Sequence, residues 1–392
     1  MKKLLALCIV FALALTLCAC GQEAPAEDSP AAASDGGDAE LEPITIVFAT
    51  PNGTANIESV YAAKWIELVE ERSEGKITFD YTDSGALGSY TELLEGVQNG
   101  VYNMTITEPS YIATYVPESA LLSLPLIYDS YDEATAILDG EVGQWYNALV
   151  AEKSNLEILN YFYCGFRYVC SEKEIDSLDD CKGVLIRSPE IDTYTDLLSL
   201  MGFSYVTMAF SEAYTSMDTG IINAVEVPLQ NIYEGGFHRL GKYICGTRHL
   251  LSVNCIVANE EFMASLPEEY REIMMTALEE VTAEERVQCE ANEQDYIEKL
   301  EAEGAVFTEF DEASKAEIVE IFGQYWTEKI EALGNPEAVE MLNKIIVRAR
   351  APTRARRASK GVCQDDENRG LSFGLLLLQR QVHEKLQAGR PL

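Results

Sequence analysis

The sequence has few of the residues that catalytic and metal sites usually need. Only three histidines occur among 392 residues, and no cysteine pair has the C-x-x-C spacing of a zinc site. No motif is present for a nucleophilic serine elbow, a phosphate-binding loop, a dinucleotide fold or a zinc protease. The sequence therefore disfavours an enzyme, and it predicts neither a cofactor nor a bound metal.

Positive charge is also scarce. The chain has 65 acidic and 29 basic side chains and a net charge of −36, which disfavours binding to nucleic acid. Residues 21–346 carry 61 acidic and 17 basic side chains, whereas residues 347–392 carry four acidic and ten basic ones. A site for anions in the main body must therefore depend on a few well-placed cations.

The first twenty residues have the charge layout of an export signal. Lys2 and Lys3 precede an apolar run from Leu4 to Leu17 that is short for a membrane-spanning helix. The run ends in LCACG and resembles the lipobox of bacterial lipoproteins, which predicts Cys20 as a lipid anchor at residue 1 of the mature chain. A plain signal peptide with a coincidental cysteine is the alternative. Either reading predicts an extracytoplasmic protein, and the first predicts one attached to the cell membrane.

Both ends of the chain beyond this signal differ from the middle. Residues 21–42 contain seven acidic and no basic side chains and are predicted to form a flexible tether. Residues 346–392 form a basic tail, predicted as an unfolded or non-native extension, although a basic arm could also bind acidic lipid or nucleic acid. Export permits disulfides, but buried thiols are favoured for the six cysteines within apolar runs: Cys164, Cys170, Cys181, Cys245, Cys255 and Cys289.

Hydrophobic patterning predicts two α/β units in tandem. Short β-branched runs alternate with segments of helical spacing, and glycines lie between them. The first unit is predicted to have strands at 44–49, 76–81 and 103–107 and helices at 61–71 and 91–98. The second is predicted to have strands at 156–163, 183–187, 204–206 and 224–227 and helices at 192–201 and 211–218. This alternation favours mostly parallel sheets. A long acidic helix is expected after Pro267.

Two arginines stand out by position. Arg167 closes the run YFYCGFR and Arg187 closes GVLIR, so each is predicted near the carboxyl end of a strand. Ligands bind at that edge of open α/β sheets, and the planar guanidinium suits bidentate binding of a carboxylate. An internal salt bridge to a nearby acid is the alternative.

Several blocks of sequence resemble one family when taken in order. They are GALGSYTELLEGVQNG at 85–100, SLPLIYDSYDEA at 123–134, DDCKGVLIRSPE at 179–190 and MAFSEAYTSMDTGIINAVEVP at 208–228. Together they are similar to the DctP-type solute-binding proteins of tripartite ATP-independent periplasmic (TRAP) transporters. The resemblance implies a two-lobed α/β fold of the type II periplasmic-binding-protein kind, with crossing hinge strands and a long connecting helix. Lobe I would comprise 43–164 and 253–292, and lobe II 165–252 and 293–345.

The resemblance also implies site residues. Arg187 matches the arginine that forms a salt bridge with the ligand carboxylate, and Arg167 matches a second arginine that assists it. Glu108 falls at a polar position of the pocket, and Phe210 at an aromatic ring that covers the ligand.

Further candidates are Thr50 and Asn52, in the loop after the first strand, and Glu190, the last residue of the block that contains Arg187. Val227 stands where the family often has an asparagine that bonds the ligand, which favours a less polar carboxylate over a heavily hydroxylated one. For Glu226, a structural hydrogen bond is favoured over ligand contact.

The implied function is that of a monomeric extracytoplasmic receptor that closes on a small organic carboxylate. Its partner would be a permease with two membrane subunits, driven by an ion gradient. A sensor module of a signalling system and a binding protein of another transporter class are the alternatives.

Overall fold

The computed structural model describes residues 41–349. The predicted signal with Cys20, nearly all of the predicted tether and the tail after Ala349 lie outside the described residues. Within the described part, no helix combines the length and the apolar character needed to cross a membrane.

The first half of the sheet is parallel and contains the three strands predicted for the first unit. Strand β1 (Ile44–Ala49) lies between β2 (Ile77–Thr82) and β3 (Met104–Thr107). The connections include α1 (Ile57–Arg72) and α2 (Tyr90–Gln98). Helix α2 begins with a capping box, in which the Ser89 hydroxyl accepts from the Glu92 amide and the Glu92 carboxylate accepts from the Ser89 amide.

The second half repeats this arrangement. Strand β5 (Leu185–Ser188) lies between β6 (Ser204–Thr207) and β7 (Ala224–Pro228), again in parallel pairs. Helix α7 (Asp192–Leu200) connects β5 to β6, and α8 (Phe210–Asp218) connects β6 to β7.

Two long strands join the halves. Strand β4 (Leu156–Ser171) pairs antiparallel with β9 (Leu251–Asn259) and then continues along β7 and β8 (Tyr243–Cys245). The resulting strand order is β2-β1-β3-β9-β4-β7-β5-β6, and β10 (Val306–Thr308) pairs with β8. The prediction of a mostly parallel sheet therefore fails at its centre. The chain crosses between the halves there, and neighbouring crossings run in opposite directions.

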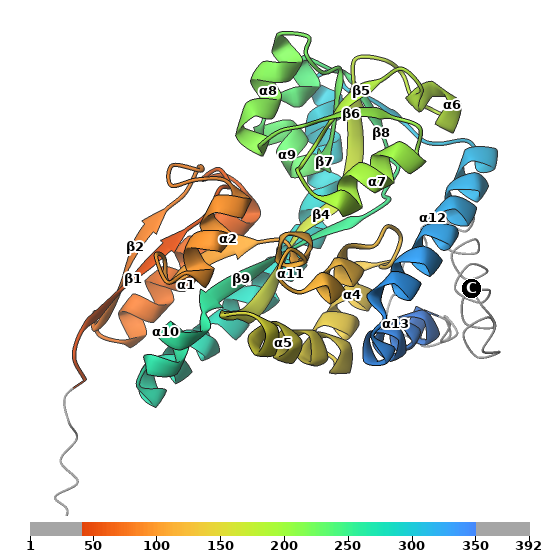
Figure 1. Cartoon of the computed structure of the whole chain (residues 1–392). Helices are drawn as coiled ribbons and strands as arrows, with labels where there is room; N and C mark the ends of the chain where they lie inside the picture. Colours follow the sequence, from red (N-terminus) through yellow and green to blue (C-terminus); the bar gives the residue numbers. More distant parts are fainter. Residues whose placement is uncertain (1–40, 350–392) are drawn as a thin grey trace, which may run out of the picture. The chain divides into compact units, whose positions relative to one another are not determined.

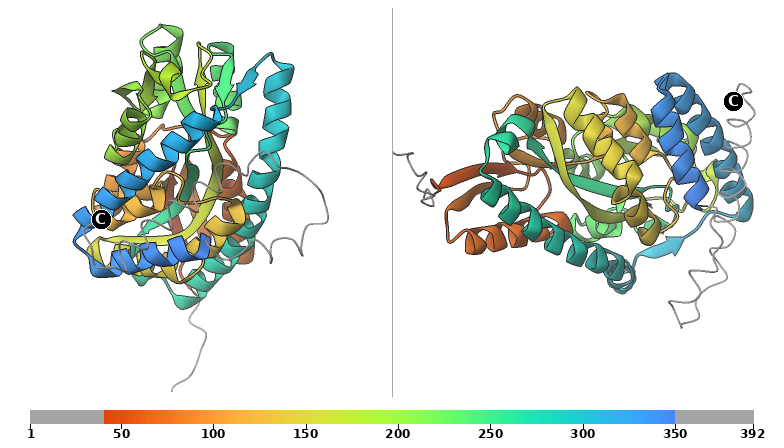
Figure 2. Two further views of the ribbon diagram at one scale, coloured as in Figure 1. Left: turned by 90° about the vertical axis from the view of Figure 1, so that its right-hand side faces the viewer. Right: turned by 90° about the horizontal axis from the view of Figure 1, so that it is seen from below.

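Long helices pack on this sheet and on the helices beside it (Figure 1). Helix α11 (Glu268–Ala302), the predicted acidic helix, contacts α1, β4 and α9 (Leu229–Glu234). Helix α12 (Glu312–Leu333) contacts both halves: Trp326 Nε1 donates to the Pro125 carbonyl at 2.9 Å, and the Tyr325 hydroxyl donates to Asp196 of α7 at 3.1 Å. Helix α13 (Pro336–Ala349) follows it and packs on α5 (Glu141–Lys153), as the turned views show (Figure 2).

Shorter helices complete the connections. They are α3 (Pro109–Ile112), η1 (Pro117–Ser123), α4 (Tyr131–Leu138), α6 (Leu178–Cys181), η2 (Phe237–Arg239) and α10 (Glu260–Ser265).

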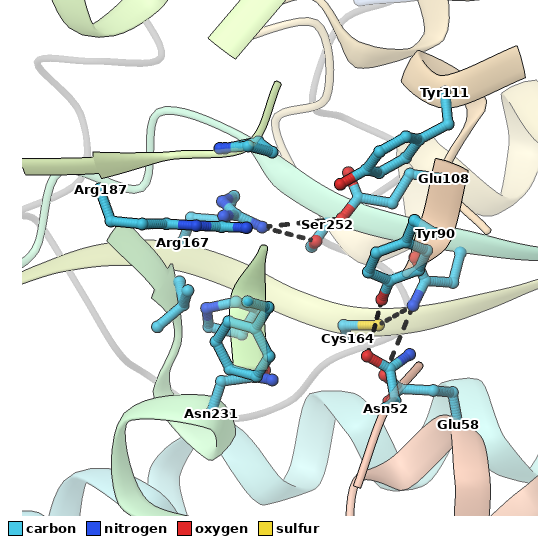
Figure 3. Close-up of a pocket in the computed structure, with 15 residues that line it drawn as sticks. Asn52, Glu58, Tyr90, Glu108, Tyr111, Cys164, Arg167, Arg187, Asn231 and Ser252 are labelled. Atoms are coloured by element: carbon cyan, nitrogen blue, oxygen red, sulfur yellow. Dashed lines mark hydrogen bonds and ion pairs between the residues drawn. The ribbon is translucent and has the colours of Figure 1, made fainter. Parts of the chain in front are cut away.

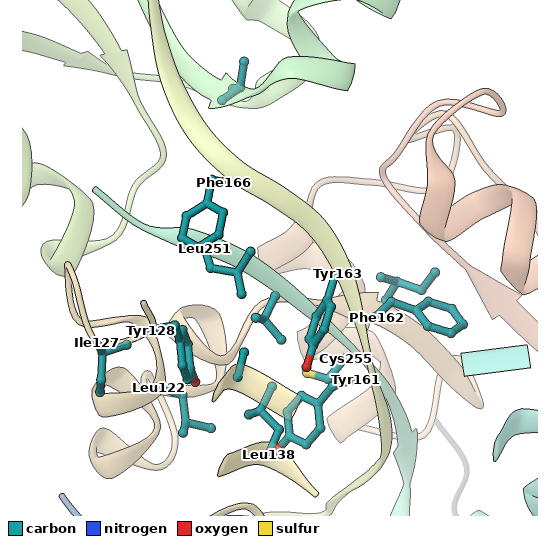
Figure 4. Packing of buried hydrophobic residues seen from close by; sticks show 14 of the residues in the cluster. Leu122, Ile127, Tyr128, Leu138, Tyr161, Phe162, Tyr163, Phe166, Leu251 and Cys255 are labelled. Atoms are coloured by element: carbon teal, nitrogen blue, oxygen red, sulfur yellow. The ribbon is translucent and has the colours of Figure 1, made fainter. Parts of the chain in front are cut away.

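The core beside the crossing strands is rich in aromatic rings (Figure 4). Tyr161 and Tyr163 of β4 are buried beside Cys255 of β9, and Phe162 is buried on the opposite face of the strand. Each such ring removes a large apolar area from water, which stabilises the crossing. All six cysteines predicted to be buried thiols are buried and free.

Candidate functional site

A polar cavity lies where the two halves of the sheet meet β4 and β9 (Figure 3). It contains about 430 Å³ of space between side chains, including a part that is open to solvent. Its walls come from both halves and from the crossing strands: Asn52, Glu58, Tyr90, Glu108, Tyr111, Cys164, Arg167, Arg187, Pro189, Phe210, Val227, Pro228, Asn231, Ser252 and Asn254.

Arg187 lies near the carboxyl end of β5, as predicted, and is 4% exposed. Its Nε donates to the Met208 carbonyl at 3.1 Å, and its guanidinium carbon is 5.8 Å from the centre of the Phe210 ring. No carboxylate of the described residues lies within 4.0 Å of this guanidinium. Burial lowers the pKa of Arg187. Within residues 41–349 the side chain is thus a buried cation that forms no ion pair, and it lines the cavity.

Arg167 also lines the cavity but has a protein partner. Its Nε donates to Glu226 Oε2 at 2.5 Å, and its Nη2 donates to Glu226 Oε1 at 2.8 Å and to the Glu226 carbonyl at 2.7 Å. Its Nη1 donates to the Ser252 hydroxyl at 3.1 Å and lies 4.0 Å from Glu108 Oε1. The predicted place of Arg167 near a strand end is wrong, because β4 continues to Ser171 through its pairing with β7 and β8.

Glu226 forms the structural hydrogen bonds that were predicted for it. It is fully buried on β7, and its Oε2 lies 3.3 Å from His249 Nε2. Burial by itself raises the pKa of Glu226, but Arg167 and His249 outweigh it and lower the pKa to about 2. The pair of Arg167 and Glu226 is therefore ionised at neutral pH.

Most of the other predicted site residues lie in the same cavity. Glu108, after β3, accepts a hydrogen bond of 2.5 Å from the Tyr194 hydroxyl. Phe210 and Val227 provide apolar wall, and Asn52 lies at another part of the lining.

Two predicted residues lie outside this cavity. The Thr50 hydroxyl accepts from the Asn52 amide at 3.3 Å and so shapes the loop that carries Asn52. Glu190 is exposed and lines two neighbouring surface clefts.

Sequence reasoning missed several lining residues, chiefly Glu58, Ser252 and Asn254. Ser252 and Asn254 are two residues apart in an otherwise apolar run, so they point to the same face of β9. Glu58 lies in the first turn of α1, where a carboxylate is usually explained as a favourable partner of the helix dipole. Polar residues at strand spacing inside LLSVNCIVAN were the available signal.

Glu58 differs from most carboxylates of this acidic chain because it is only 3% exposed. Its Oε1 accepts from Asn254 Nδ2 at 3.4 Å, and no cation of the described residues lies within 4.0 Å of it. Burial raises the pKa of Glu58 to about 7. Figure 3 shows Glu58 and Asn52 away from Arg187, so the cavity has cations at one end and a weakly acidic group at another.

A polar cavity between two α/β halves that are joined by crossing strands defines the class of two-lobed solute-binding proteins. Comparison with known proteins gives the family. The family model DctP, bacterial extracellular solute-binding protein family 7, matches residues 48–332. The chain belongs to this family, and it is an extracytoplasmic solute-binding protein of the TRAP type and not an enzyme.

Individual relatives agree with this assignment. A solute-binding protein of Roseobacter denitrificans is 30% identical over 256 residues, which cover 64% of this chain and 78% of that protein. A crystal structure of a TRAP periplasmic solute-binding protein from that organism, with bound L-galactonate, is 27% identical with a TM-score of 0.68 and covers 72% of this chain and 95% of that one. A crystal structure of a sugar acid binding protein from Advenella mimigardefordensis, in complex with galactonate, is 22% identical with a TM-score of 0.73. It covers 78% of this chain and 100% of that one.

Proposed function

We propose that the chain captures a small organic carboxylate in this cavity and delivers it to a membrane permease. The observation that carries the proposal is Arg187, a buried guanidinium that has no counter-ion among the described residues and lines the cavity. An unpaired buried charge is costly, and a ligand carboxylate removes that cost by forming charge-assisted hydrogen bonds.

Arg167 has a different role in this mechanism. Glu226 already occupies its Nε and Nη2, which leaves Nη1, bonded to Ser252, as the part nearest to a ligand. Arg187 therefore supplies the unbalanced positive charge, while Arg167 supplies an oriented donor and a rigid wall. Phe210 and Val227 cover the ligand with apolar surface, which excludes water and strengthens the polar contacts.

Closure of two lobes accompanies capture in this proposal. Lobe I comprises 43–164 and 253–292, and lobe II comprises 165–252 and 293–345. The ligand contacts residues of both, with Glu58 and Glu108 in the first and Arg187 and Phe210 in the second. A ligand that binds the closed form more tightly shifts the population toward it, and this closed form is what a permease would recognise.

Replacement of Arg187 tests the carboxylate site. Arg187→Ala is expected to weaken carboxylate binding by about 3–5 kcal/mol, because the ligand would be desolvated without its partner. Isothermal calorimetry of the full chain with a ligand found by screening carboxylates for a rise in melting temperature measures this change. Arg239→Ala is the matched control, since the Arg239 side chain is 66% exposed. Unchanged affinity in Arg187→Ala would refute the assignment.

The site of action is proposed from the sequence. Cys20 carries the lipid that attaches the chain to the cell membrane, and the permease is the two-subunit membrane partner of a TRAP system. Cys20→Ala is expected to move the protein from the membrane fraction to the soluble fraction. Retention of that variant in the membrane fraction would contradict the anchor.

A further inference from the structure

We propose that Tyr194 and Asp196 of helix α7 form an inter-lobe latch, which holds lobe II against lobe I and so positions the two lobes for capture of a ligand. The proposal rests on the proposed function, because a latch acts only in a receptor whose lobes part and close. It assigns positioning roles to two side chains of the described part of the chain that do not belong to the lining of the ligand cavity.

Tyr194 contacts the opposite lobe with its hydroxyl group. This hydroxyl donates to Glu108 Oε2 at 2.5 Å, and Tyr194 is 1% exposed. Glu108 follows β3 in lobe I, whereas α7 belongs to lobe II. The guanidinium carbon of Arg167 lies 4.9 Å from the centre of the Tyr194 ring. Tyr194 therefore connects a carboxylate of one lobe with an arginine of the other, and a hydrogen bond to a carboxylate is stronger than one between neutral groups.

Helix α12 passes from one lobe to the other. Near its start, the Ser314 hydroxyl accepts from the Leu178 amide of lobe II at 3.0 Å. Farther along, Trp326 is fully buried and donates to the Pro125 carbonyl of lobe I, and the following helix α13 packs on α5 of the same lobe. The second half of α12 is therefore fixed to lobe I.

Asp196 contacts this second half of α12. Its Oδ2 accepts from the Tyr325 hydroxyl at 3.1 Å and lies 2.8 Å from Lys329 Nζ. Tyr325 and Lys329 are four residues apart and therefore neighbours on one face of α12. Tyr194 and Asp196 are two residues apart in α7 and so point in different directions. The same helix is thus held to lobe I at two separate points, Glu108 and the end of α12.

The position of α7 in the chain connects the latch with the ligand. The helix follows β5, whose Arg187 is the cation proposed to bind the carboxylate, and only residues 189–191 lie between them. One short segment therefore carries both the ligand contact and the inter-lobe contacts. Contacts between the lobes raise the fraction of closed receptor, and the apparent affinity is proportional to the fraction that is competent to bind. The latch should therefore strengthen the binding of every carboxylate by the same factor.

Hydrogen exchange of the ligand-free full chain tests the latch. Tyr194→Phe removes only the hydroxyl, so the lobes are expected to part more often. Amide exchange should become about tenfold faster at 108–113 of lobe I as well as at 192–200 of α7. Asp196→Ala is expected to cause a smaller increase, about two- to fivefold, at 192–200 and at 325–333 of α12, because this ion pair is partly exposed to water.

Ser199→Ala is the matched control, because Ser199 lies on the same helix and its hydroxyl donates to the Thr195 carbonyl of that helix at 2.8 Å. Circular dichroism checks that each variant is folded, and Glu108→Gln, which weakens the same contact from lobe I, serves if Tyr194→Phe does not fold. Unchanged exchange at 108–113 would overturn the proposal. Faster exchange that is confined to α7 would also overturn it, since that result would show a local structural role.

Arg187→Ala separates this proposal from the proposed function, because the exchange experiment needs no ligand. Faster exchange of both lobes in Tyr194→Phe, together with unchanged carboxylate binding in Arg187→Ala, would refute the carboxylate site and support the latch. Loss of carboxylate binding in Arg187→Ala, together with unchanged exchange in Tyr194→Phe, would support the carboxylate site and overturn the latch. Unchanged exchange at 325–333 in Asp196→Ala would overturn the role of Asp196.

Discussion

Arg167 and Arg187 are buried to the same extent, each 4% exposed, and differ in what surrounds the guanidinium. Arg167 has Glu226 as an ionised partner, with His249 behind it. Arg187 has a carbonyl and the face of an aromatic ring. The first arginine is therefore part of the fold, and the second is available to a ligand.

Replacement of each arginine should distinguish these roles by stability. Arg167→Ala is expected to lower the free energy of unfolding by about 3–5 kcal/mol, because it leaves the Glu226 carboxylate buried without its partner. Arg187→Ala should have a much smaller effect, since it leaves no buried carboxylate without its cation and removes only the donor to the Met208 carbonyl. Urea denaturation of the ligand-free variants measures both changes. Equal losses of stability would show that the two side chains are equally structural.

Glu58 should make stability depend on pH. Its pKa of about 7 exceeds that of an exposed glutamate, so the native state binds this proton more tightly than the unfolded state. The stabilisation is complete below the unfolded pKa and is lost as the pH rises through about 7. A shift of this size corresponds to roughly 3 kcal/mol.

Glu58→Gln should remove this part of the dependence, which denaturation at about pH 5 and about pH 8 would measure. Burial also raises the pKa of Glu285, and the nearby Glu58 raises it further. The difference between the two proteins therefore reports Glu58 together with its repulsion of Glu285. An identical loss of stability with pH in both would contradict the prediction.

The sequence predicted the arginines better than their partners. Arg187 was found because a cation at the end of an apolar strand is unusual, whereas the pairing of Arg167 with Glu226 depends on β4 and β7 being neighbours. Such contacts cannot be recognised from local sequence, because the two positions are 59 residues apart in the chain. Asn254 and Glu58 were missed for the same reason, since they meet only through the packing of α1 on the sheet.

Among the elements, β4 has the most unusual course. Gly165 has a φ of +103° where β4 passes its register irregularity and leaves the first half of the sheet. An added Cβ there would lie 3.5 Å from the Tyr131 hydroxyl, which is ordinary contact, so any cost of substitution comes from the backbone. Glycine adopts this conformation without the steric cost that other residues bear.

Gly165→Ala is therefore expected to lower the free energy of unfolding by about 1–3 kcal/mol. Gly53→Ala is the control, because Gly53 is not among the glycines with positive φ and an added Cβ there would lie 3.6 Å from Asn56 Oδ1. Urea denaturation of both variants measures the difference. A Gly165→Ala protein as stable as Gly53→Ala would show that the backbone relaxes at no cost.

The same strand marks the limit of pattern-based prediction for elements. Alternation located β1, β2 and β3 well, because each is bounded by polar loops or glycine. In β4, a glycine at 165 and a charged residue at 167 are typical of the end of a strand. The strand nevertheless continues to Ser171, because β7 and β8 satisfy its backbone hydrogen bonds. The helices α12 and α13 have local signals that the prediction did not use: Asp311 caps the start of α12, Gly334 follows its end, and α13 begins at Pro336.

For the whole molecule, a net charge of −36 opposes the approach of an anionic ligand. Raising the ionic strength from about 0.01 M to about 0.15 M should therefore increase the association rate of a carboxylate, roughly a few-fold, by screening this repulsion. Stopped-flow fluorescence measures the rate. A truncated chain that lacks the basic residues 347–392 should show a larger increase. A rate that falls with salt would mean that local cations outweigh the total charge.

Strand β9 places two polar side chains along the cavity, Ser252 toward Arg167 and Asn254 toward Glu58. Because both belong to one stretch of regular backbone, the spacing between them is set by the strand and not by their side chains. Substitutions at these two positions would change the chemical groups that face the cavity and leave their spacing unchanged. A different spacing would require residues to be added or removed in the crossing strand itself.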